Sequence, residues 1–227
     1  MKKRILSACA TGLLLTFWAC GGSDKQTVET GEAKAVDTAA VAAARELTID
    51  TAASRVLWEG SEGLAKILTS HTGSFNIQSG SLSVKDSQLV AGKFVIDINS
   101  IQNFDIKRLD KKADFIGHMK SADFFESAKF PTATFELVSA EKLPSDSVRV
   151  TGNLTMKGVT KSVVFPAKVA MTGDGLSANA KFYINRKDWG MNWHSEASLG
   201  DELIRPEVGV ELKIAAKWWA WGVGRRA

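Results

Sequence analysis

The sequence predicts a single all-β domain over residues 46–217, preceded by an export signal and a linker. Apolar and polar residues alternate from Leu47 onward, with turn residues between the runs. Of the 227 residues, 44% are hydrophobic and 24% charged, and only two are Cys, which favours an ordinary globular domain over a disulfide scaffold. Many short strands with short links are typical of a sandwich or an up-and-down barrel.

Ten alternating segments, some of them adjacent, make roughly eight or nine strands. Lys157-Gly158 predicts a turn, and Asp174-Gly175 is a strong hairpin signal. In order along the chain, the segments are 55–59, 74–78, 81–85, 93–98, 132–139, 147–156, 159–165, 167–172, 176–184 and 208–214.

One segment, residues 105–126, departs from the strand pattern. Ile106, Leu109, Ala113 and Ile116 recur at helical spacing, and Met119 or Lys120 continues the series. We therefore expect one or two short helices that interrupt the β-structure.

Residues 1–19 have the pattern of a secretory signal peptide. Lys2, Lys3 and Arg4 precede a mostly apolar run, 5–18, which is too short to span a bilayer because a spanning helix needs about 20 apolar residues. Removal of these three cations reduces the net charge from +4 to +1. The remaining charge gives no indication of a nucleic-acid partner.

The end of the leader resembles a bacterial lipobox, in which a small residue precedes a Cys that becomes acylated and N-terminal. Ala19 and Cys20 occupy these positions, and Phe17 stands where the pattern prefers Leu, Val or Ile. Because Cys9 leaves with the leader, acylation of Cys20 removes the remaining exposed thiol. We expect a lipid anchor on the outer membrane, facing the periplasm, because no Asp directly follows Cys20. The alternative is an unmodified Cys inside a signal sequence.

Residues 20–45 predict a flexible tether. The stretch contains no aromatic residue and is rich in Gly, Ser, Thr, Ala, Lys and Glu, so it cannot bury a core. A flexible chain of this size has a root-mean-square reach of about 25–30 Å.

Several sequence blocks resemble, in order, the motifs of the YceI family. Met119 replaces the usual Leu of that family and Phe130 its usual Tyr, both mild changes, and the resemblance extends over about 47–217. The blocks are HTG at 71–73, DINS at 97–100, GHMKSADFFE at 117–126, FPTATF at 130–135, VTGNLTMKGVTK at 150–161 and FYINRKDWGM at 182–191.

The resemblance implies a lipocalin-like antiparallel barrel of eight strands that holds a long amphiphile such as a polyisoprenoid or an isoprenoid quinone. Eight strands enclose an interior wide enough either to be filled by side chains or to hold one slender ligand. The inward side chains therefore either line a cavity or form a packed core. The residues expected to line a cavity are Phe75, Phe94, Ile96, Phe135, Leu154, Phe165, Phe182, Trp189 and Trp193.

Arg186 is the candidate for contact with a ligand head group. A guanidinium donates in a fixed fork and suits a polar group at the barrel mouth. The alternative is an ion pair with Asp97 or Asp188 that fixes a strand end. Trp189 and Trp193 either cap the barrel or line its opening.

The sequence contains no recognisable catalytic or metal motif. His71, His118 and His194 lie far apart and lack the close spacing of a zinc or iron site. Nucleophile-elbow, P-loop, Rossmann and HExxH patterns are missing from the sequence. We therefore expect no metal, no cofactor and no enzymatic activity.

Residues 218–227 form a tail rich in Trp and Arg. Indole rings and cations suit a membrane interface, although the tail could instead cover one barrel end or be a frayed terminus. The predicted function is binding, sequestration or transport of an isoprenoid-type lipid in the cell envelope. The alternative is an envelope stress or interaction protein with a solid barrel.

Overall fold

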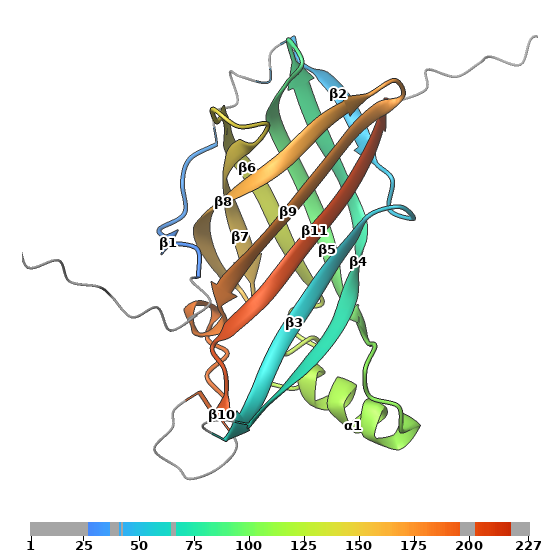
Figure 1. Ribbon diagram of the computed structural model, residues 1–227, viewed down its shortest axis with the longest axis vertical. Helices are drawn as coiled ribbons and strands as arrows, with labels where there is room; N and C mark the ends of the chain where they lie inside the picture. Colours follow the sequence, from blue (N-terminus) through green and yellow to red (C-terminus); the bar gives the residue numbers. More distant parts are fainter. Residues whose placement is uncertain (1–26, 37–40, 42, 65–66, 196–202, 219–227) are drawn as a thin grey trace, which may run out of the picture.

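The computed structural model describes residues 27–36, 41, 43–64, 67–195 and 203–218. In this part of the chain, eight long strands form a barrel with one α-helix at one end (Figure 1). These elements are β3 (Arg55–Leu64), β4 (Ile67–Lys85), β5 (Gln88–Asn103), α1 (Leu109–Lys120), β6 (Thr132–Lys142), β7 (Val148–Met156), β8 (Val159–Thr172), β9 (Gly175–Asn185) and β11 (Glu207–Trp218).

Antiparallel pairing closes the barrel. Each long strand from β3 to β9 pairs with the next along the chain, and β11 pairs with both β9 and β3. A short strand, β2 (Arg45–Ile49), pairs with β4 and β11 beyond the point where β3 leaves them. The predicted eight-stranded antiparallel barrel is therefore confirmed, and its closure gives each long strand a neighbouring strand on both sides.

Two pairs of predicted strands are each one long strand. β4 contains both 74–78 and 81–85, and β8 contains both 159–165 and 167–172. Pro166 interrupts the pattern in β8 but not the strand itself. It lies exposed on the surface, and its missing N–H is tolerated because β8 changes its neighbour there.

Strand alternation buries the faces that the sequence predicts to be inward. Phe94, Ile96 and Ile98 of β5 are each 7% exposed or less, as are Ala133 and Phe135 of β6. Successive side chains of a strand point to opposite faces, so each strand contributes every second residue to the barrel interior.

The helix α1 covers the end of the barrel at which β3 meets β4 (Figure 1). Phe115, Ile116 and Met119 pack against the core. Leu109, which the helical pattern places on the apolar face, is instead 81% exposed. The buried face of α1 is set by Phe115 and Met119, which are one turn apart.

Residues 28–34, which we call the N-terminal strap, contribute to the barrel wall. Their short strand β1 (Thr30–Gly31) pairs with β8, and the amide of Val28 donates to the carbonyl of Tyr183 in β9, 2.7 Å away. β8 and β9 pair directly only from Ala167 onward. The strap thus bridges these two strands where they are not paired with each other.

Polar side chains fix the strap. The side chain of Asn153 exchanges two hydrogen bonds with the backbone of Lys34, of 2.8 and 2.9 Å. The hydroxyl of Thr30 donates to Asp188 at 2.8 Å. The prediction of a wholly solvated tether is therefore wrong for these residues, because polar composition does not exclude added-strand pairing.

Trp218, expected at the start of the tail, is the last residue of β11. The guanidinium of Arg45 lies 4.0 Å from the centroid of its ring. Residues 219–227, the rest of the predicted tail, lie outside the described residues.

Candidate ligand-binding site

The barrel contains an apolar cavity at the end covered by α1. Its volume is about 140 Å³, well above the roughly 10–15 Å³ that one water molecule requires. We call it the lower cavity. Its walls are alternate apolar residues of the long strands, and the charged and hydroxyl-bearing side chains of its lining are Ser61, Glu62, His71, Arg186 and Arg205.

Most of the side chains predicted to line a cavity contact this one. They are Phe75, Phe94, Ile96, Phe135, Leu154 and Phe182. Phe165 is stacked against Phe182, with the two ring centroids 4.1 Å apart. It lines a second, smaller cavity instead of this one.

The two predicted Trp residues lie outside the lining of the lower cavity. Trp189 is fully buried, and its indole N–H donates to the carbonyl of Leu154 at 3.0 Å. Trp193 is 40% exposed. Its ring lies against His118 and is stacked on His194, with centroid distances of 5.6 and 4.6 Å.

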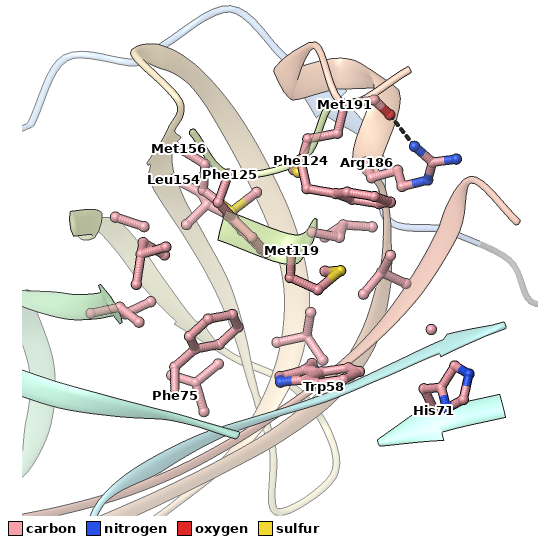
Figure 2. A pocket seen from close by; sticks show the side chains of 18 of the residues that line it. Trp58, His71, Phe75, Met119, Phe124, Phe125, Leu154, Met156, Arg186 and Met191 are labelled. Atoms are coloured by element: carbon pink, nitrogen blue, oxygen red, sulfur yellow. Dashed lines mark hydrogen bonds between the residues drawn. The ribbon is translucent and has the colours of Figure 1, made fainter. Parts of the chain in front are cut away.

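Residues of the helical segment close one end of the cavity, a role that our sequence analysis missed. Phe115 and Met119 come from α1. Figure 2 shows Met119 together with Phe124 and Phe125, which follow the helix in the chain. The ring of Phe125 meets that of Phe75 edge-on at 5.3 Å. Aromatic residues beside a helical apolar series are the signal that could have predicted this cap.

Arg186 lies in the cavity wall but is engaged by backbone carbonyls. Its side chain is in the 3-10 helix η2 (Arg186–Trp189) and is 3% exposed. One terminal nitrogen donates to Met191 (Figure 2). The other donates to Trp193 and Ile204, at 2.6 and 2.9 Å, and Nε donates to Arg205 at 3.2 Å.

The carboxylate pairing considered for Arg186 is therefore replaced by carbonyl pairing. Burial lowers the pKa of Arg186 to about 10, and the nearby charge of Glu207 opposes that shift. The side chain stays cationic at neutral pH. It ties η2 and the turn after it to β10 (Leu203–Ile204), whose Ile204 lines the cavity. We call the cavity rim the lining residues Ser61, Glu62, His71, Arg186, Ile204 and Arg205.

His71 bridges two carboxylates at the cavity rim. Its Nδ1 lies 2.6 Å from Oδ2 of Asp105, and its Nε2 lies 3.1 Å from Oε1 of Glu62. The ring of Phe115 packs 5.0 Å from the imidazole. The other oxygen of Asp105 accepts from the amide of Thr72 at 2.8 Å.

These contacts shift two pKa values in opposite directions. Burial by itself lowers the pKa of His71, but the hydrogen bonds to Asp105 and Glu62 outweigh it and raise the pKa above 6.5. Burial raises the pKa of Asp105, but the hydrogen bonds from Thr72 and His71 outweigh it and lower the pKa. The cluster therefore favours an imidazolium between two carboxylates.

Replacing His71 with Gln is expected to destabilise the protein more at low pH than at high pH. Because the pKa of His71 is higher in the folded state, its stabilisation is complete below the unfolded pKa of about 6.5 and disappears as pH rises through the folded pKa. We expect a difference on the order of 1 kcal/mol at low pH, since both carboxylates are partly exposed. Thermal unfolding of both proteins from about pH 5 to pH 9 measures it, and a difference that grows with pH contradicts the assignment.

Two buried nitrogen donors in the cavity lining have no hydrogen-bond partner within the described residues: Nε1 of Trp58 and Nε of Arg205. A buried donor without a partner costs about 1–3 kcal/mol. The cavity lining therefore contains hydrogen-bonding capacity that the described protein groups leave unused.

The histidines are distributed over the rim and its surroundings. Nε2 of His118 lies 3.0 Å from Oδ2 of Asp123, and His118 and His194 share Trp193 as a neighbour. Among the residues that the structure describes, no three or more His, Cys, Asp or Glu side chains are grouped to hold a metal ion.

The predicted leader, residues 1–19, and the predicted lipidation site, Cys20, lie outside the described residues. Within the described ranges, no helix has both the length and the apolar character required to cross a membrane.

Comparison with known proteins agrees with this architecture. The family model of the YceI-like domain matches residues 47–216 of this chain. A UPF0312 protein of Yersinia pestis is 36% identical over 152 residues, which cover 62% of this chain and 74% of the relative. Protein YceI of Salmonella arizonae is 33% identical over 150 residues, with the same two coverages.

A solved structure shares the fold. The crystal structure of BcnA from Burkholderia cenocepacia superposes with a TM-score of 0.57 at 20% identity, covering 73% of this chain and 98% of BcnA. With the family model matching most of the chain and the barrel closed as described, the protein belongs to the YceI-like domain family.

Proposed function

We propose that this protein binds, without converting it, an amphiphilic lipid of isoprenoid type, such as a polyisoprenoid or an isoprenoid quinone. The observation that carries the proposal is the lower cavity, whose walls are apolar and whose charged lining residues come from the rim segments. Burial of an alkyl chain in such walls contributes about 0.8 kcal/mol for each CH₂ group. One long apolar chain with one polar end fits this distribution.

The polar end of the ligand would lie beside Arg186 and Arg205. The unpaired Nε donor of Arg205 supports an acceptor oxygen there, because a ligand oxygen would satisfy a group that is otherwise costly to bury. Arg186 adds positive charge to this end, while its own N–H groups donate to backbone carbonyls. A quinone carbonyl, a hydroxyl or a phosphate has the required acceptor.

Binding without turnover is supported by the arrangement of the rim. The two ring nitrogens of His71 face the carboxylates of Asp105 and Glu62 rather than a hydroxyl nucleophile. The hydroxyl of Ser61, also in the lining, lies 3.0 Å from that of Ser70. A carrier needs an apolar cavity and a polar group at its mouth, but no positioned proton shuttle.

The proposal includes attachment to the cell envelope through acylated Cys20, at the outer membrane facing the periplasm. The lipobox resemblance supports it. The strap begins eight residues after Cys20, at Val28, so an anchor would hold the barrel within about 30 Å of the bilayer. Several acyl chains at one site give stable attachment.

Native mass spectrometry of the full chain, extracted gently from membranes, tests both parts. We expect a retained ligand with the mass of an isoprenoid lipid, on a protein whose N-terminus carries acyl chains. The matched variant Cys20→Ser should lose the acyl mass and membrane fractionation but keep the ligand. A protein without any lipid adduct favours the solid-barrel interaction protein, and a chemically converted lipid favours an enzyme.

A further inference from the structure

Four phenylalanine rings cross the barrel interior beside the lower cavity. The ring centroids of Phe94 and Phe135 are 5.2 Å apart, those of Phe135 and Phe165 are 5.8 Å apart, and those of Phe165 and Phe182 are 4.1 Å apart. We call these four residues the aromatic layer. They come from β5, β6, β8 and β9, and each is 8% exposed or less.

Gly152 allows the layer to continue past β7. This strand lies between β6 and β8, yet a Cβ at Gly152 would lie 2.2 Å from Cζ of Phe135. The missing side chain gives Phe135 the space through which its ring approaches Phe165. The layer therefore depends on five neighbouring strands: four contribute a ring, and β7 contributes the glycine that leaves room for one of them.

The layer separates the lower cavity from a second cavity of about 50 Å³, which we call the upper cavity. Phe94 and Phe135 line both cavities, whereas Phe182 lines only the lower one and Phe165 only the upper one. Because Phe165 and Phe182 are stacked nearly parallel, at 12°, the partition is one stacked ring pair thick at this point. The lining of the upper cavity is apolar except for Asn179.

We propose that the aromatic layer sets the length of the apolar chain that the barrel accepts. This inference rests on the proposed function, since it concerns the chain that occupies the lower cavity. Each methylene buried before the chain reaches the layer raises affinity about fourfold. A methylene beyond that point must either displace packed aromatic rings or stay at the mouth, so it adds no affinity.

The intact layer then keeps the apolar chain of the ligand out of the upper cavity. Phe165 is the residue to remove, because it lies on the upper side of the stacked pair and does not line the lower cavity. Its truncation should open a path past Phe182 while leaving the walls of the lower cavity intact. The variant should then accept longer chains than the wild type.

The test is a chain-length series on purified full-length protein and on Phe165→Ala. The probes are straight-chain alcohols from 1-hexanol to 1-hexadecanol in two-carbon steps, measured by displacement of 1-anilinonaphthalene-8-sulfonate. For the wild type, we expect affinity to rise by about tenfold or more per step and then to level off. For Phe165→Ala, we expect the plateau to begin at least one step later.

Phe75→Ala is the matched control, because Phe75 lines the lower cavity but is not part of the layer. It should change affinity without moving the plateau to longer chains. Phe165→Leu, which conserves more volume, replaces Phe165→Ala if the latter does not fold. A plateau at the same chain length in wild type and variant overturns the inference but not the proposed function. Failure of every alcohol to bind either protein overturns the proposed function.

Discussion

Replacing Phe135 with Asp is expected to unfold the barrel. The ring is 7% exposed, lines both cavities and touches the rings of Phe94 and Phe165. Loss of a buried Phe side chain costs about 3–5 kcal/mol, and a buried carboxylate without a partner adds several more. The sum approaches the roughly 5–15 kcal/mol that stabilises a typical domain. Circular dichroism and thermal unfolding should show loss of the native transition.

Glu136→Ala is the matched control, because Glu136 is the next residue and points to the opposite face. Its side chain is 40% exposed, and its 3.6 Å pair with Lys93 lies on the surface. Such pairs contribute about 0–1 kcal/mol, so we expect a small change in Tm and full retention of lipid. Similar, mild effects of both substitutions would show that the register of β6 is wrong.

Replacing Arg186 with Met is expected to be nearly as damaging. Hydrogen bonds to a charged group contribute about 1.5–3 kcal/mol each, and Arg186 donates to the carbonyls of four residues. Some of those carbonyls can turn to water, so we expect a loss on the order of 4 kcal/mol of unfolding free energy. Chemical denaturation measures it, and ligand retention should fall as the rim formed by β10 loosens.

Two further variants separate the possible reasons for that loss. Arg186→Lys keeps the charge but not the planar fork, so it should recover only part of the stability. Lys187→Met removes a neighbouring, exposed cation and should change stability little. Full recovery by Arg186→Lys would show that charge alone matters and would contradict the carbonyl-bridging role.

The strands could be predicted because their physical cause is local. Alternation in β5 and β6 records which side chains must avoid water. The hairpin predicted at Asp174-Gly175 joins β8 to β9, but its two turn residues are Gly173 and Asp174, one position earlier, and Gly175 begins β9. Pro166 misled the division of β8, because a proline is tolerated where the neighbouring strand changes, and the identity of that neighbour is not encoded nearby.

The contacts within the rim could not be predicted, because they join residues far apart in the chain. His71 meets Asp105 across 34 residues, and no spacing rule connects such positions. Arg186 was singled out as a rim residue, but its carbonyl partners could not be predicted, because every residue carries a carbonyl and only the fold decides which ones converge. The cap formed by Phe124 and Phe125 has a signal in the sequence that the Arg186 partners lack, because both residues follow an apolar helical series.

The N-terminal strap has a consequence for how the barrel avoids association with other chains. Without it, the edge of β8 at Ser162 and Val163 and the carbonyl of Tyr183 would lack their present partners. An open strand edge is a template for pairing with a strand of another molecule. Because the strap is covalently joined to β2, its effective concentration at this edge is on the order of millimolar. The protein thus supplies its own donor strand, which competes intramolecularly against strand exchange and edge-to-edge aggregation.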